Sequence, residues 1–386
     1  MKLCSYHFIF LFASCSIRSS APLMYTTLMT STNKIASLTS ASARSLHATA
    51  NHDGNENNII LQSECHCGKV VLDITLPREY SSDDEDSKVW NCHCYSCRRY
   101  HTASHVSYLQ VPRGQISINS PKMLGKYSSS CSSLDEGTDK VMERWYCTEC
   151  SSKLLSVVST TITKNDEKSE REQSSDCLVN LGPINSDTIP QAHSRRWKEQ
   201  LKQIENNLHS FQEESPSCRW AGVLPSNTEM SYSARRRMQL PYAKMWSGSC
   251  ECGACKYEIS LTRLTQLQHC YCNLCRKLSG SPYSTWLPVD KEHFQWKQSD
   301  AVTLVRTTPV GQRHICSKCR GVLTIVYDDQ PNLIWPCAGG LDDATLPDSS
   351  GEMGTLLSRV CHICCRHLPP WIDLPEDDTE KLPDAC

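Results

Sequence analysis

Residues 91–99 read Asn-Cys-His-Cys-Tyr-Ser-Cys-Arg-Arg, which places the thiols of Cys92, Cys94 and Cys97 at C-x-C-x-x-C spacing. A tight C-x-x-C turn lets two thiolates meet one ion at about 2.3 Å from each sulfur, and the C-x-C step brings a third from the approaching strand. This spacing is typical of a zinc site. We call these three cysteines the first knuckle.

The same frame occurs again in residues 268–277, Gln-His-Cys-Tyr-Cys-Asn-Leu-Cys-Arg-Lys, and its cysteines form the second knuckle (Cys270, Cys272 and Cys275). A C-x-C pair precedes each knuckle and a C-x-x-C pair follows it. These pairs are Cys65 with Cys67, Cys147 with Cys150, Cys250 with Cys252, and Cys316 with Cys319. Seven cysteines thus recur in one order at an offset of roughly 170 to 185 residues, too long for a solenoid period and suited to a duplicated domain.

The composition is that of a globular chain with two or three domains. Of its 386 residues, 21% are charged and 39% hydrophobic, and the formal net charge of −2 gives no general attraction to nucleic acid. No stretch approaches the roughly 20 apolar residues of a membrane span. The 25 cysteines include many close pairs in a long chain, a pattern that favours zinc in a reducing compartment over a disulfide scaffold.

The N-terminal segment differs from the rest of the chain. Residues 1–52 contain no Asp or Glu and are rich in Ser, Thr and Ala, which is typical of a transit peptide for a mitochondrion or plastid. The apolar run at residues 8–13 also suits a signal-peptide core. The alternative is a disordered tail without an address, on a protein of the cytoplasm or nucleus.

Strand-like runs follow residue 59. The β-branched and alternating patterns predict strands at residues 69–76, 106–111, 115–119 and 153–163. Polar residues predict a solvated loop at 81–87 and an insertion at 164–175. Apolar residues at helical spacing predict an amphipathic helix at 194–211, with Trp197, Leu201, Ile204, Leu208 and Phe211 facing a core.

These patterns divide the chain into a presequence and two repeated units. The expected boundaries are 1–52 for the presequence, 53–190 for the first domain, 191–243 for the helix and linker, 244–378 for the second domain and 379–386 for a tail. The tail region of the second domain carries Cys361, Cys364 and Cys365. They can bind metal, but Trp371 beside an apparent terminal strand favours buried free thiols.

Seven thiolates per copy are one short of two tetrahedral zinc sites, so four plus three is the natural division. Two distant pairs pinned by one ion hold a β unit together, which makes a closed, structural site. We assign this role to the first closed set (Cys65, Cys67, Cys147 and Cys150) and the second closed set (Cys250, Cys252, Cys316 and Cys319). Each knuckle then leaves one coordination position open.

An open zinc with three thiolates suits sulfur chemistry. Three negative ligands quench Lewis acidity, so water is activated poorly, whereas a soft site captures another thiol as thiolate. The basic residues behind the knuckles can pair with substrate carboxylates or balance the anionic knuckle: Arg98, Arg99, Arg276 and Lys277. In the alternative, His66, His93, His269 or a water fills the fourth position and every zinc is structural.

These motifs resemble the glutathione-dependent formaldehyde-activating enzyme and centromere protein V (CENP-V/GFA) family, as a tandem pair over residues 61–189 and 245–375. The resemblance rests on the seven cysteines of each copy, the basic pairs, residues 339–343 (Gly-Gly-Leu-Asp-Asp), and His362-Ile363 with Trp371. It implies a mainly β, tent-like fold with two zincs per domain, four per chain, and the same division of ligands. It also implies carbon–sulfur lyase activity that joins or releases formaldehyde and glutathione as S-hydroxymethylglutathione.

Departures from the family pattern distinguish the two copies. Ser151 and Arg320 stand where the family usually has Gly after the last C-x-x-C, and Thr102 stands where the second copy keeps Gly280. The second copy also keeps the more typical strand Ser-Pro-Tyr-Ser-Thr-Trp-Leu-Pro-Val. We therefore expect the second domain to be the binder or catalyst of a small thiol and an aldehyde. The alternative is a non-catalytic zinc module, as in the chromosome-associated branch of the family.

Overall fold

The computed structural model describes residues 57–78, 88–131, 139–161, 176–207, 239–263, 267–345, 360–376 and 379–384. The transit-like segment at 1–52, the acidic loop at 81–87 and the insertion at 164–175 lie outside these residues. Among the helices described, none is long and apolar enough to cross a bilayer.

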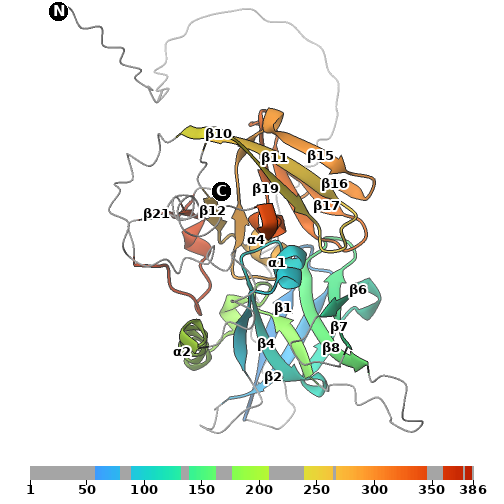
Figure 1. Ribbon diagram of the computed structural model, residues 1–386. Coiled ribbons are helices and arrows are strands. Elements are labelled where there is room, and N and C mark those ends of the chain that lie inside the picture. Colours follow the sequence, from blue (N-terminus) through green and yellow to red (C-terminus); the bar gives the residue numbers. More distant parts are fainter. Residues whose placement is uncertain are drawn as a thin grey trace, which may run out of the picture. The chain divides into compact units, whose positions relative to one another are not determined.

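The first half of the described chain forms two antiparallel sheets (Figure 1). One sheet has the order β1 (Asn58–Glu64), β2 (Val71–Pro77), β5 (Ile116–Ile118). The other has the order β3 (Val89–Cys92), β4 (Val106–Pro112), β9 (Asp176–Asn180), β8 (Lys153–Thr161), β7 (Asp139–Cys147), β6 (Leu124–Cys131). The strands predicted at 69–76, 106–111, 115–119 and 153–163 are confirmed as β2, β4, β5 and β8.

The second half forms three sheets. The first sheet has the order β10 (Gln239–Ser249), β11 (Lys256–Arg263), β15 (Phe294–Gln298). The second has the order β13 (Ser284–Trp286), β12 (Leu267–Cys270), β20 (Val360–Ile363), β21 (Glu380–Leu382). The third has the order β14 (Val289–Asp290), β19 (Leu333–Pro336), β18 (Val322–Tyr327), β17 (Gly311–Cys316), β16 (Val302–Arg306). Strand β20 pairs in parallel with β12 and β21, and the other pairs of these sheets are antiparallel.

The helices follow the two knuckles and the end of the first half. α1 (Tyr95–His101) and α4 (Asn273–Ser279) begin inside the first and second knuckle. α2 (Gln191–Asn207) confirms the predicted amphipathic helix up to residue 207, since Trp197 and Leu201 are buried. Leu208, Phe211 and the side chain of Ile204 lie outside the described part of the chain. Short 3₁₀ turns occupy Arg113–Gln115, Pro121–Met123, Ser186–Thr188, Lys291–His293, Ala338–Gly340, Asp343–Thr345 and Cys365–His367.

Left-handed backbone marks the ends of the cysteine turns. Ser151 and Arg320, directly after the C-x-x-C pairs, both have φ of 63°, and Thr102 ends α1 with φ of 54° where Gly280 ends α4 with φ of 76°. Only glycine enters this region without a steric cost. The departures noted in the sequence therefore fall at positions where the backbone favours Gly.

The two halves meet along the knuckle helices, with α1 and α4 side by side (Figure 1). Gly339 of the second half lies against the backbone of α1's end, where a Cβ would come 2.5 Å from the nitrogen of Ala103. Gly182 of the first half lies in the same way against α4's end, 2.5 Å from the carbonyl oxygen of Arg276 for a built Cβ. The backbone at the end of each knuckle helix thus packs against a glycine of the other half, at a distance that leaves no room for a side chain.

Candidate metal centres

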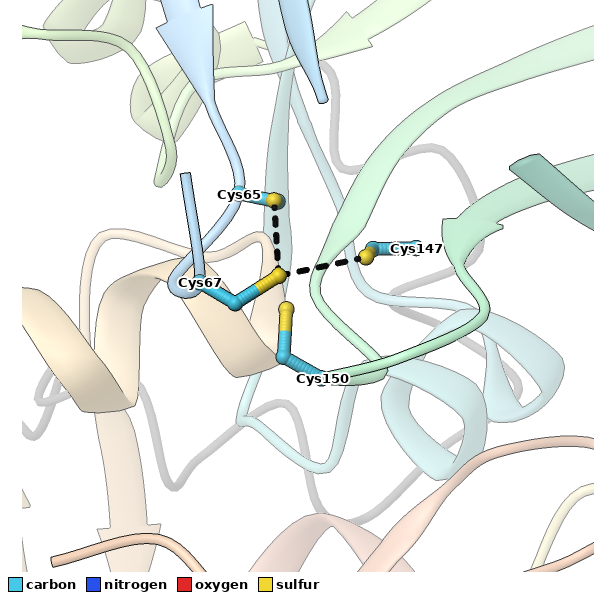
Figure 2. A group of neighbouring side chains, drawn as sticks. All are labelled: Cys65, Cys67, Cys147 and Cys150. Atoms are coloured by element: carbon cyan, nitrogen blue, oxygen red, sulfur yellow. Dashed lines mark hydrogen bonds between the residues drawn. The ribbon is translucent and has the colours of Figure 1, made fainter. Parts of the chain in front are cut away.

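The first closed set brings two distant parts of the first half together. Cys65 and Cys67 follow β1, while Cys147 is the last residue of β7 and Cys150 follows it. Their four sulfurs lie within 4.8 Å of one another, and Figure 2 shows them pointing toward a common centre. The Cys67 sulfur lies 3.5 Å from that of Cys65 and 3.7 Å from that of Cys147.

The second closed set repeats this arrangement in the second half. The sulfur of Cys252 lies 3.5 Å from that of Cys250 and 3.6 Å from that of Cys316, and Cys319 completes the group. A fifth cysteine, Cys255, is buried beside it and its thiol interacts with Cys250 and Cys316. Sequence reasoning missed Cys255, although Cys250, Cys252 and Cys255 have the same C-x-C-x-x-C spacing as the knuckles.

The sulfur positions of both closed sets fit a tetrahedral zinc. Four sulfurs at about 2.3 Å from one ion stand about 3.8 Å apart, close to the 3.5, 3.6 and 3.7 Å measured here. Backbone N–H groups also aim at the ligands, from Val70 to Cys65 at 3.2 Å and from Cys255 to Cys250 at 3.3 Å. Such donors stabilise thiolates, the form that binds a metal.

The first knuckle holds Cys92, Cys94 and Cys97 in one mutually close group. Cys94 is the N-cap of α1, and its sulfur accepts from the N–H of Cys97 at 3.4 Å. The buried Arg144 donates from Nη1 and Nη2 to the Cys97 sulfur at 3.7 and 3.8 Å. Cys92 and Cys97 are buried, whereas Cys94 is partly exposed, so solvent reaches this group on one side.

The second knuckle keeps the same frame with one difference. Cys272 caps α4 and accepts from the N–H of Cys275 at 3.4 Å, and the buried Arg313 donates to Cys275 at 3.6 Å. The mutually close sulfurs, however, are those of Cys270, Cys272 and Cys364. Cys364 lies 3.6 Å from Cys270 and is disulfide-bonded in this structure. The expectation of buried free thiols in this tail is therefore wrong for Cys364. Cys361 and Cys365 form no disulfide, and of these two Cys361 is buried whereas Cys365 is partly exposed.

The surroundings lower the pKa of one thiol in each knuckle. The pKa of Cys97 lies well below its ordinary value because Cys92 and Cys94 donate to it, and the charge of Arg144 adds to this effect. The pKa of Cys275 is lowered in the same way by Cys270 and Cys272, with Arg313 adding to it. These contacts favour the thiolate form of one sulfur in each knuckle, and the thiolate is the form that binds a metal ion.

Of the four basic residues behind the knuckles, Arg98 and Arg276 are buried, and Arg99 and Lys277 are partly buried. Arg98 and Arg276 are only 1% and 3% exposed, and they donate to the carbonyl oxygens of His93 and His367. Arg99 pairs with Asp342 at 3.7 Å, and Lys277 pairs with Glu64 at 2.8 Å. Both of these ion pairs join one half to the other, so this placement favours a structural role for the basic residues.

The candidate histidines do not complete the cysteine groups. Among the described residues, the groups suited to a metal contain cysteines alone. His93 stacks on His105 with ring centroids 5.0 Å apart, and His269 bonds to the hydroxyl of Thr285 at 3.0 Å. His66 is exposed, and its backbone N–H donates to the hydroxyl of Ser152 at 2.9 Å.

Two arginines that contact the knuckle cysteines were not predicted from the sequence. Arg144 and Arg313 each stand three residues before a C-x-x-C pair, at the same place in both copies. That common spacing was the available signal. The pairing of each guanidinium with the third cysteine of its own knuckle depends on the fold, because β7 and β17 carry the arginines far along the chain from the knuckles.

Comparison with known proteins agrees with the duplicated cysteine frame. The sequence model of "Glutathione-dependent formaldehyde-activating enzyme" matches residues 60–188 and again 245–355, together more than half of the chain. A Halomonas elongata protein named "Putative glutathione-dependent formaldehyde-activating enzyme" is 26% identical over 140 residues, which cover 35% of this chain and 83% of the relative.

Among solved structures, a crystal structure of a Rhodobacter sphaeroides protein is 16% identical and covers 28% of this chain and 93% of that chain, with a TM-score of 0.22. That score is too low to support an argument. The two matched regions, the mainly β architecture and the repeated cysteine groups lead to one conclusion. The chain belongs to the glutathione-dependent formaldehyde-activating enzyme family, with two domains of that family in tandem.

Proposed function

We propose that the knuckles are open zinc sites that bind a small thiol such as glutathione and hold it for reversible addition to an aldehyde. The observation that carries this proposal is the uneven burial of each knuckle. Two cysteines of each knuckle are buried, and Cys94 or Cys272 is partly exposed, so a fourth sulfur can approach from the solvent side. In the second knuckle this sulfur has to share the site with Cys364, which lies 3.6 Å from Cys270. The family and the name of the Halomonas relative support glutathione and formaldehyde as the pair.

The chemistry assigned to the chain is of the carbon–sulfur lyase type. A bound zinc supplies a soft cation that favours the thiolate form of a substrate thiol. The sulfur lone pair forms a bond to the carbonyl carbon, the C=O π electrons move to oxygen, and solvent provides the proton. The cysteines, Arg144 and Arg313 hold the site's geometry, and the same steps in reverse release thiol and aldehyde.

The second candidate function is a zinc-stabilised module without catalysis. The observation favouring it is that Arg98 and Arg276 are buried and bonded to carbonyl oxygens, while Arg99 and Lys277 are tied to acidic residues. In this reading the basic residues bind no substrate carboxylate. Arg98 and Arg276 stabilise their own half, and Arg99 and Lys277 join the two halves.

The test measures zinc per chain and glutathione affinity in the full-length protein. Wild type is compared with a first-knuckle variant, Cys94→Ser with Cys97→Ser, and a second-knuckle variant, Cys272→Ser with Cys275→Ser. Four zincs in wild type, loss of about one zinc in each variant, and loss of glutathione binding in at least one variant support the open-site proposal. Two zincs in wild type, or glutathione affinity unchanged by both double substitutions, would favour the structural module.

A further inference from the structure

A carboxylate of the second half reaches the first knuckle. Glu251 lies between Cys250 and Cys252 of the second closed set, and its Oε1 accepts from the hydroxyl of Ser96 at 2.6 Å. Ser96 in turn lies between Cys94 and Cys97 of the first knuckle. Glu251 and Ser96 are both only partly exposed, and both lie in one compact unit that spans residues 55–386.

The contact continues to a metal ligand. Arg144 donates from Nη2 to the hydroxyl of Ser96 at 2.7 Å and from Nη1 to the sulfur of Cys97 at 3.7 Å. A chain of hydrogen bonds therefore runs from Glu251 through Ser96 and Arg144 to Cys97. Since the hydroxyl of Ser96 has one proton, donating it to Glu251 leaves its lone pairs for Arg144.

The backbone of the second closed set is also held by the first half. Arg99 donates from Nε to the carbonyl oxygen of Ser249 at 3.4 Å, immediately before Cys250. Lys277, the matching residue of the second knuckle, donates to Glu64 at 2.8 Å and to the carbonyl oxygen of Cys65 at 3.5 Å. Each knuckle helix is thus braced against the C-x-C turn of the other half's closed set.

The relay through the hydroxyl of a knuckle residue belongs to the first knuckle. In the second knuckle the residue matching Ser96 is Leu274, which has no polar group, and the residue matching Glu251 is His66.

The second knuckle has a different path from the opposite C-x-C turn. The ring of His66 bonds to the backbone of Thr307, and Arg313 donates both to the hydroxyl of Thr307 and to the sulfur of Cys275. The two paths differ because only the one through Ser96, among the described contacts, passes through a residue of the knuckle itself.

We propose that Glu251 is a positioning residue through which the second closed set controls the metal affinity of the first knuckle. A metal held by Cys250 and Cys252 fixes the turn that carries Glu251, and Glu251 fixes Ser96 and Arg144 against Cys97. By linkage, a metal in the first knuckle strengthens metal binding at the second closed set by the same factor. This inference rests on zinc occupancy in the proposed function, but it needs no bound thiol.

The test follows how fast each cysteine loses its metal. Zinc-loaded full-length protein is treated with a chelator and iodoacetamide, and alkylation of each cysteine is measured by peptide mass spectrometry. In Glu251→Ala and Ser96→Ala we expect Cys92, Cys94 and Cys97 to be alkylated about tenfold faster or more, as for other partners of metal ligands. The first closed set is expected to keep its wild-type rates.

Glu149→Ala is the matched control. Glu149 also lies between two closed-set ligands, Cys147 and Cys150, but its carboxylate pairs with Lys69 of its own half at 3.1 Å. This substitution is expected to leave the first knuckle unchanged. The double variant of Glu251 and Ser96 is expected to be no faster than the faster single variant, because both substitutions break one relay.

The outcomes separate this inference from the proposed function. The proposed role of Glu251 would be wrong if the first-knuckle cysteines of Ser96→Ala were alkylated at wild-type rates. It would also be wrong if Glu251→Ala sped up the alkylation of Cys250 and Cys252 alone. If Glu251→Ala unfolds the protein, all cysteines react together and the Ser96→Ala result decides. Lack of protection of the first knuckle in wild type would instead refute the zinc assignment on which both proposals rest.

Discussion

The Nδ1 atom of His101, at the end of α1, lies 2.6 Å from the carbonyl oxygen of Ser279, at the end of α4. The other ring nitrogen lies 3.1 Å from the hydroxyl of Tyr108. Because a carbonyl oxygen only accepts, Nδ1 carries the proton and Nε2 accepts from Tyr108. A neutral, fully buried imidazole therefore joins the helices of the two halves.

This contact makes stability depend on pH. Burial lowers the pKa of His101 to about 3, whereas an unfolded histidine titrates near 6.5. Between these values the unfolded chain binds a proton that the native protein does not. The contribution of His101 to the free energy of unfolding is thus complete above about pH 6.5 and is lost as the pH falls toward 3, by about 1.4 kcal/mol per pH unit.

His101→Phe isolates this effect. Urea unfolding at several values between about pH 5 and 6 is expected to give a smaller slope of unfolding free energy against pH than in wild type, by up to about 1.4 kcal/mol per unit. The cysteine titrations are common to both proteins and cancel in the difference. Parallel curves for the two proteins would show that His101 accepts a proton in the native state.

Arg144 is expected to govern how tightly the first knuckle holds zinc. Arg144→Gln removes the positive charge beside the Cys97 sulfur, so protons compete better with the metal. We expect metal affinity at the first knuckle to fall by about tenfold to a hundredfold and zinc to be released at higher pH. A chelator that changes colour on binding zinc measures both quantities.

Two other arginines serve as comparisons for this prediction. Arg313→Gln is expected to weaken the second knuckle alone, because Arg313 donates to Cys275. Arg306→Gln is the control, since Arg306 forms an exposed pair with Asp328 at 2.7 Å. Equal zinc release from wild type and Arg144→Gln would contradict a role for this guanidinium in metal retention.

Much of the fold and both closed sets could be predicted from sequence because the ligand pairs are local. A C-x-C or C-x-x-C turn fixes two sulfurs within a few residues, and a shared order in two copies then suggests which pairs share an ion. The helix at α2 was predictable for a similar reason, since Trp197 and Leu201 are one turn apart and both are buried.

The relay at the first knuckle could not be predicted in this way. Glu251 and Ser96 lie 155 positions apart, and their contact exists only because α1 packs against the second half. The same packing turns Arg99 and Lys277 toward acidic residues of the other half. Sequence spacing reports contacts within a turn or along a strand, whereas docking of two halves depends on the shape of both.

Ser151 offers a test of backbone strain beside the first closed set. Its φ of 63° costs a non-glycine residue about 1–2 kcal/mol, and glycine loses part of that gain through its greater freedom when unfolded. Ser151→Gly is expected to raise the free energy of unfolding by about 0.5–1 kcal/mol. Gly68→Ala, at φ of 72°, is expected to lower it, and chemical denaturation measures both. A Ser151→Gly protein that is less stable than wild type would show that its side chain outweighs the strain.

The end of the chain is expected to hold the two halves in one folding unit. Trp371 is buried against Trp197 of α2, with ring centroids 6.0 Å apart, and the Arg276 guanidinium lies 5.3 Å from the Trp371 ring. Removing a buried tryptophan of this kind typically costs about 3–5 kcal/mol. We expect Trp371→Ala to lower the midpoint of thermal unfolding of the whole protein in one transition, because its ring packs into the core of the first half.

Trp197→Ala is expected to have a similar effect, and the double variant is expected to cost less than the sum of the two, because each ring loses the same neighbour. Trp296→Ala is the comparison, since that ring is only partly buried and contacts Phe294 and His314 within the second half. Its cost is expected to be smaller. Two separate transitions in Trp371→Ala, with one at the wild-type temperature, would show that the halves unfold independently and that this packing does not couple them.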